Sequence, residues 1–170
     1  MATPMMLTFV LPLDHEGRLQ KIATPKLSKY GIYVIRHEQD VIRIGESSSG
    51  VDRIVKGLRE PLRKILRGKD RKNYLAYHWR PDFSNESIHA DYFELNDDPF
   101  SDNHLRRALE AEVTFQFRLA LQAWPRCMSE IHFLERYRRN EHLVQKATEL
   151  LLNYGHQYNH TIFREGAKDV

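Results

Sequence analysis

The chain contains the residue types that cleavage of a phosphodiester bond requires, at a regular spacing. Tyr33, Arg43 and Arg53 follow one another at intervals of ten residues, and two carboxylates, Glu110 and Glu112, lie further along the chain. A phosphodiester under attack gathers negative charge, which a fixed guanidinium such as that of Arg53 and a bound divalent cation can stabilise. Because Mg²⁺ keeps several of its waters, one protein carboxylate can be enough to hold it. These residues therefore point to metal-assisted chemistry on a phosphate.

A β-hairpin and the helix after it are predicted to position the first three of these residues. The sequence KYGIYVIRHEQDVIRIG, residues 29–45, has two β-branched and aromatic runs on either side of a polar insert, which is typical of two paired strands. Small residues at 46–50 predict a loop. Apolar side chains at a spacing of three to four residues then predict a helix over 51–66, with a kink or break because Gly57 and Pro61 weaken the pattern.

Further strands are predicted on both sides of this unit. Alternating residues predict strands at 74–79 and 87–95, which can form a second hairpin across the turn-rich segment 81–86. Residues 1–13 are apolar and lack the features of a signal peptide. We expect them to form a first strand or a packing segment.

The second half of the chain is predicted to be helical. Ser101 or Asp102 can cap a helix that runs to about Ala123. Its apolar positions repeat every four residues: Leu105, Leu109, Val113, Phe117 and Leu121. Residues 129–154 predict one or two more helices, ended by Gly155. The predicted fold is therefore α+β, with a small, mostly antiparallel sheet of three or slightly more strands, flanked by helices, and a helical C-terminal part.

The hairpin and the helix after it also carry the motifs of a known family. Residues 31–33 read GIY, residues 43–45 read RIG, and Arg53 and the later segment LEAEV follow. This arrangement resembles the GIY-YIG nuclease family, with RIG in place of YIG, over roughly residues 30–121. The resemblance implies a nuclease domain over 1–125, with 126–170 as its helical C-terminal extension.

The resemblance implies a role for each site residue. In this family the tyrosine of GIY deprotonates or orients the attacking water, the helix arginine faces the scissile phosphate, and a glutamate in a late helix holds one divalent cation. Tyr33, Arg53 and Glu110 match these positions, and Arg43 stands where the second motif has its tyrosine. The implied cofactor is Mg²⁺ or Mn²⁺, and the implied activity is endonucleolytic cleavage of DNA, or of RNA.

Helix geometry separates the two candidate metal ligands. At 3.6 residues per turn, Glu112 falls between Ala108 and Phe115 within the apolar arc of its helix, where an unpartnered carboxylate is costly. Glu110 falls at the edge of that arc, where its side chain can face a cleft. Glu110 is therefore the preferred ligand, with Glu112 as the alternative.

A run of basic residues follows the helix that carries Arg53. It consists of Arg59, Arg63, Lys64, Arg67, Lys69, Arg71 and Lys72. Because Tyr74 and Tyr77 come next, we expect this run to follow the backbone of a nucleic acid. A solvated helix face is the alternative interpretation.

Composition limits the other possibilities. The 170 residues have a formal net charge of +3 and a pI of about 9.0, which permits a polyanionic partner without requiring one. Cys127 is the only cysteine, which excludes an intramolecular disulfide and favours a reducing, cytoplasmic location. No apolar run approaches the roughly 20 residues needed to cross a bilayer, so no membrane partner is expected. Besides a metal-dependent endonuclease, a catalytically silent nucleic-acid-binding module and a protein-interaction domain stay open.

Overall fold

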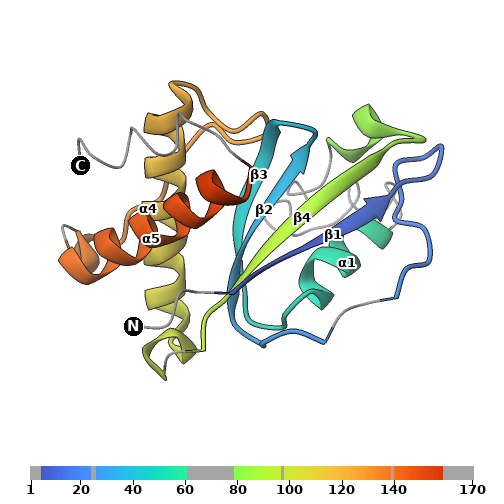
Figure 1. Cartoon of the computed structure of the whole chain (residues 1–170). Helices are drawn as coiled ribbons and strands as arrows, with labels where there is room; N and C mark the ends of the chain where they lie inside the picture. Colours follow the sequence, from blue (N-terminus) through green and yellow to red (C-terminus); the bar gives the residue numbers. More distant parts are fainter. Residues whose placement is uncertain (1–4, 24–25, 61–78, 97, 139, 159–170) are drawn as a thin grey trace.

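A four-stranded antiparallel sheet forms the centre of the molecule. The computed structural model describes residues 5–23, 26–60, 79–96, 98–138 and 140–158 (Figure 1). In spatial order the strands are β1 (Met6–Pro12), β4 (Ser87–Glu94), β2 (Gly31–His37) and β3 (Asp40–Ser47). Each neighbouring pair in this order is antiparallel, and β1 and β3 form the two edges. The sheet and its helices confirm the predicted α+β fold, with four strands instead of three.

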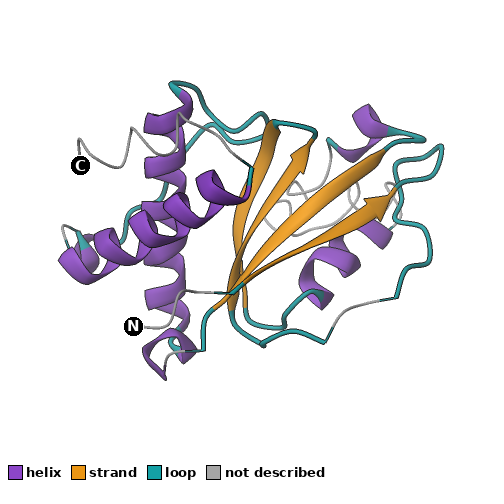
Figure 2. Ribbon diagram, in the orientation of Figure 1, coloured by secondary structure: helices purple, strands orange, loops and turns teal. Residues whose placement is uncertain are grey.

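Helices cover both faces of this sheet (Figure 2). Helix α1 (Asp52–Arg59) packs on one face, and α4 (Asn103–Leu121) and α5 (Glu141–Gln157) pack on the other. In the described parts of the connections lie three short 3₁₀ helices: η2 (Arg80–Phe83), η3 (Asp98–Ser101) and η4 (Glu135–Tyr137). None of the described helices is long and apolar enough to cross a membrane.

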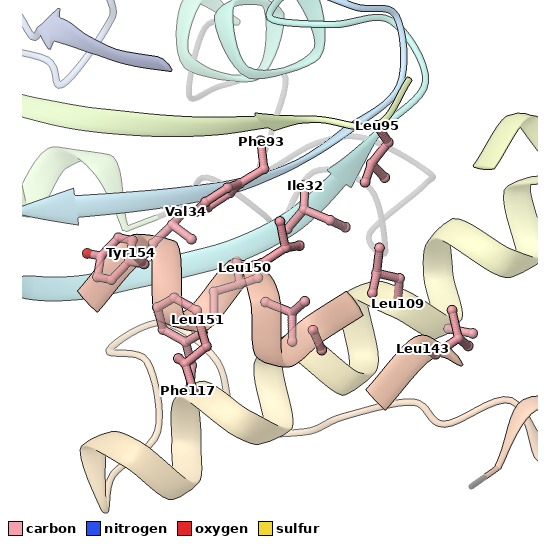
Figure 3. Packing of buried hydrophobic residues seen from close by; sticks show 14 of the residues in the cluster. Ile32, Val34, Phe93, Leu95, Leu109, Phe117, Leu143, Leu150, Leu151 and Tyr154 are labelled. Atoms are coloured by element: carbon pink, nitrogen blue, oxygen red, sulfur yellow. The ribbon is translucent and has the colours of Figure 1, made fainter. Parts of the chain in front are cut away.

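Strand β2 contributes side chains to the core on each face of the sheet. Ile32 and Val34 pack with α4 and α5, whereas Tyr33 and Ile35 pack with α1, because successive side chains of a strand point to opposite faces. A strand buried on both faces must be apolar at consecutive positions, which accounts for the unbroken run in the GIY segment. Figure 3 shows the core between the sheet and the helices α4 and α5.

Two glycines of the hairpin lie under tyrosine rings. A Cβ atom at Gly31 would lie 2.3 Å from Cζ of Tyr92, and a Cβ atom at Gly45 would lie 2.3 Å from Oη of Tyr33. Each ring therefore crosses the neighbouring strand at a point where only glycine leaves room for it. The glycines of the GIY and RIG motifs are explained by the packing of these two tyrosines.

The helix predicted over 51–66 breaks where Gly57 and Pro61 weaken its pattern: α1 ends at Arg59, because Glu60 precedes Pro61 and has an extended backbone with ψ of 136°; the residue before a proline disfavours the helical conformation. Residues 61–66 lie outside the described residues. Two predicted element boundaries are wrong. Strand β3 continues to Ser47, into the segment predicted as a loop. Helix α5 continues through the buried Gly155 to Gln157, because packing of this face on the core outweighs the helix cost of glycine, about 1 kcal/mol.

Other predicted elements are confirmed. Helix α4 is capped by Asp102, whose carboxylate accepts a hydrogen bond of 2.7 Å from the N–H of His104. The apolar N-terminal segment forms β1, and the strand predicted at 87–95 is β4. However, β4 pairs with β1 on one side and β2 on the other. Of the hairpin partner predicted at 74–79, Trp79 lies in a turn and the rest is outside the described residues.

The segment after α4 returns to the edge of the sheet. The backbone N–H groups of Arg126 and Cys127 donate hydrogen bonds of 2.9 Å to the carbonyl oxygens of Val41 and Ile42. Residues 126–127 therefore cover the side of β3 that has no neighbouring strand. We call this side the outer edge of β3.

Candidate functional site

The predicted site residues come from four elements around β3. Arg43 lies on β3 and Tyr33 on the neighbouring β2. Arg53 is exposed near the start of α1, and Glu110 is partly buried in α4. Residues 48–51 connect the end of β3 directly to α1. The end of this edge strand is therefore where side chains from the two helical layers can approach one another.

Tyr33 and Arg43 share one face of the sheet. Tyr33 lies opposite Gly45, and Ile35 lies opposite Arg43, so Arg43 is a diagonal neighbour of Tyr33, a relation in which residues are typically about 7–8 Å apart. Tyr33 is only 2% exposed, and its hydroxyl lies against Gly45. The tyrosine is thus held in the α1 side of the core, beside Arg43.

Charged groups from several elements shift the pKa of Glu110. Burial and the charge of Glu46 raise the pKa of the Glu110 carboxyl to about 7. Three guanidinium groups act on this carboxyl in the opposite direction, those of Arg43, Arg53 and Arg107. These charges act on Glu110 from β3, from α1 and from α4 itself. Arg43 and Arg53 therefore act electrostatically on Glu110, although Arg43, like Tyr33, lies on the sheet face away from α4.

A buried ion pair, not found by sequence analysis, fixes α4 against β3. Arg106 donates from Nε to Oε2 of Glu46 at 3.1 Å and from Nη1 to the carbonyl oxygens of Phe100 and Ser101 at 2.8 Å. Arg106 precedes Glu110 by one helical turn, so the same contacts fix Glu110 relative to β3. The sequence places Glu46 in a loop of small polar residues, and only its position inside β3 turns its side chain towards α4. In the sequence, the four-residue spacing of Arg106 and Glu110 predicts only that these two side chains lie on the same side of α4.

The alternative carboxylate faces a different part of the molecule. Glu112 accepts a hydrogen bond of 3.1 Å from Nε2 of Gln116, and Gln116 also donates to the carbonyl oxygen of Val144 in α5 at 3.2 Å. Glu112 is thus partnered at the interface between α4 and α5. The charges of Arg43, Arg53 and Arg107 act on Glu110 instead. Glu110 therefore stays the preferred candidate ligand.

The surroundings of Glu110 fit a single divalent cation. Burial is the main cause of its raised pKa, and a bound cation would favour the charged form of the carboxylate. Within the described residues, no group of three or more His, Cys, Asp and Glu side chains could hold a metal ion. A cation at Glu110 would therefore need water and substrate oxygens as its other ligands, which Mg²⁺ accepts.

The predicted basic run is only partly described. Arg59 is exposed at the last position of α1. The other six residues lie outside the described residues: Arg63, Lys64, Arg67, Lys69, Arg71 and Lys72. No protein-family model, curated protein or solved structure matches the chain.

The raised pKa of Glu110 predicts a pH-dependent stability. The folded state holds this proton more tightly than the unfolded chain, so the stabilisation is complete below the ordinary pKa of 4.5 and is lost as the pH rises through about 7. A shift of this size corresponds to about 3 kcal/mol. Because glutamine cannot ionise, Glu110→Gln should raise the free energy of unfolding at about pH 8 and change it little at about pH 4. Urea denaturation at the two pH values measures this, and an equal effect at both would contradict the assignment.

Proposed function

We propose that the chain is a metal-dependent endonuclease that hydrolyses DNA phosphodiester bonds through a GIY-YIG-type site. The observation that supports this most strongly is that the charges of Arg43 and Arg53 both act on the partly buried carboxyl of Glu110, although the three residues come from a strand and from helices on opposite faces of the sheet. A partly buried carboxylate among guanidinium groups suits a metal and a phosphate together.

Each side chain has a part in the proposed reaction. The exposed guanidinium of Arg53 would bind the scissile phosphate and stabilise the charge that gathers on it. Arg43, which is only partly buried, would add a second contact through its guanidinium. Glu110 would hold Mg²⁺ or Mn²⁺, which when bound supplies Lewis-acid activation of the phosphate. Tyr33 would accept the proton of the attacking water or orient that water.

The second candidate function is a catalytically silent DNA-binding module on the same fold. The burial of Tyr33, which is 2% exposed, favours it, because a proton acceptor has to reach the attacking water. Both candidates need the arginines, and only the endonuclease needs the metal. They are therefore separable by one set of measurements.

The wild-type protein should cut plasmid or oligonucleotide DNA in the presence of Mg²⁺ or Mn²⁺, and a chelator should stop it. Arg53→Ala should weaken both binding and cutting, because it removes a phosphate contact. If highly purified wild type cuts neither DNA nor RNA with any divalent ion while Arg53→Ala still loses DNA binding, the silent module replaces the endonuclease. If wild type shows neither cutting nor salt-dependent binding, both candidates fail and a protein-interaction domain is the remaining interpretation.

A further inference from the structure

Strand β3 contains one residue more than its pairing with β2 requires. Arg36 of β2 lies opposite Val41. The residue before it in β2, Ile35, lies opposite Arg43, so that Ile42 has no partner in β2. This arrangement is a β-bulge, in which two residues of one strand oppose one residue of the other. The pairing of the two strands continues on both sides of the bulge.

The bulge puts two successive side chains on the same face of the sheet. Val41 and Ile44 pack in the core with α4 and α5, whereas Ile42 packs in the core with α1. Arg43 lies opposite Ile35, which belongs to the α1 core, so Arg43 lies on the α1 face as well. In a regular strand successive side chains alternate between the faces. Alternation from Ile42 would have turned Arg43 towards the core with α4 and α5.

The two side chains of the bulge have different surroundings. Ile42 is 0% exposed and fills the α1 core, whereas Arg43 is only partly buried. One position cannot serve both residues, because the core needs an apolar side chain and burial of an isolated charge is costly. The extra residue removes this conflict. Ile42 occupies the core, and Arg43 lies beside it on the face that carries Tyr33.

The segment along the outer edge of β3 pairs with the bulge itself. The carbonyl oxygens of Val41 and Ile42 accept hydrogen bonds of 2.9 Å from the N–H groups of Arg126 and Cys127. In a regular strand the carbonyl groups of successive residues point to opposite sides. Here two successive carbonyl groups point to the same side, and the segment after α4 satisfies both of them. These hydrogen bonds therefore stabilise the bulged form of β3.

We propose that this bulge positions Arg43 for contact with a DNA phosphate, with Ile42 as the positioning residue and the N–H of Cys127 as the contact that maintains the bulge. This inference rests on the proposed function and adds to it the means by which the arginine of the RIG motif is directed. Bulges occur often next to active sites, where they change the direction of a side chain. Ile42 acts through Arg43 and does not touch the reacting atoms.

The salt dependence of binding to a labelled duplex oligonucleotide, measured in chelator, tests the proposal. Arg43→Gln should make the log–log slope of affinity against salt shallower by roughly 0.9, the value for one phosphate contact on duplex DNA. Deletion of Ile42 removes the bulge and keeps Arg43 opposite Ile35, and it should lower the slope by the same amount. Adding Arg43→Gln to the deletion should change nothing further, because both changes remove one contact. A loss of stability alone would not produce this coupling.

Cys127→Pro and Cys127→Ala test the same bulge without a change in β3. Proline lacks the N–H that donates to Ile42, whereas alanine keeps it. Cys127→Pro should lower the slope by the same amount as Arg43→Gln, and Cys127→Ala should leave it unchanged. This matched pair decides the question if the deletion variant does not fold.

The proposal is overturned if Arg43→Gln lowers the slope equally in wild type and in Cys127→Pro, since Arg43 then reaches the phosphate without the bulge. It is also overturned if wild type has a steep slope that Arg43→Gln does not reduce. In both cases the proposed function still stands when wild type cuts DNA. If the affinity of wild type does not change with salt, the proposed function itself fails.

Discussion

Glu110→Gln should lower the rate of metal-dependent DNA cutting by about 10³-fold or more, the scale of several kcal/mol of transition-state stabilisation by a bound metal. The substitution keeps the size and shape of the side chain and removes the charge that would hold the cation. DNA binding should remain, because the neighbouring guanidinium groups of Arg43, Arg53 and Arg107 are retained. Cleavage rates across a series of Mg²⁺ and Mn²⁺ concentrations, with binding measured in chelator, separate the two effects.

Glu112→Gln is the control for this prediction. It makes the same chemical change two residues further along α4, where glutamine can still accept the hydrogen bond from Gln116. Its cutting rate should stay within a few-fold of wild type. If Glu112→Gln loses cutting and Glu110→Gln retains it, the two carboxylates have been assigned in the wrong order. If both retain full activity, neither holds the metal.

Gly45→Ala should lower the rate of DNA cutting nearly as much as Tyr33→Phe, for which loss of a general base predicts about 10²–10⁴-fold. The added Cβ would lie 2.3 Å from Oη of Tyr33, so the ring has to move. A displacement of about 1 Å in a reacting group can cost about 10²-fold. The backbone of β3 and the arginine of the RIG motif are otherwise unchanged.

Gly31→Ala is the matched control for the effect of steric strain. Its Cβ would lie 2.3 Å from Cζ of Tyr92, an equally severe contact on the same sheet face with a tyrosine outside the proposed site. Both glycine variants should lose stability in thermal unfolding, and only Gly45→Ala should lose cutting beyond what its stability explains. Equal losses of cutting in the two variants would remove Tyr33 from the mechanism.

Local patterns in the sequence were enough to predict most of the elements. The two apolar runs around a polar insert predicted the hairpin of β2 and β3, and the four-residue repeat with its Asp102 cap predicted α4. These signals are local, because turns, caps and the periodicity of apolar side chains depend on residues close together in the chain. The GIY and RIG glycines were visible as motifs, but the rings of Tyr92 and Tyr33 that require them became visible only in the fold.

The assembly of the candidate site was decided by the tertiary structure. The sequence placed Tyr33, Arg43 and Arg53 at equal intervals, but strand alternation and pairing put Tyr33 beside Arg43, and the packing of α1 and α4 lets the charge of Arg53 act on Glu110. The contact of Glu46 with Arg106, residues 60 positions apart, depends on packing α4 across the sheet. Charge interactions act through space, so the raised pKa of Glu110 follows from the fold and has no counterpart in local sequence patterns.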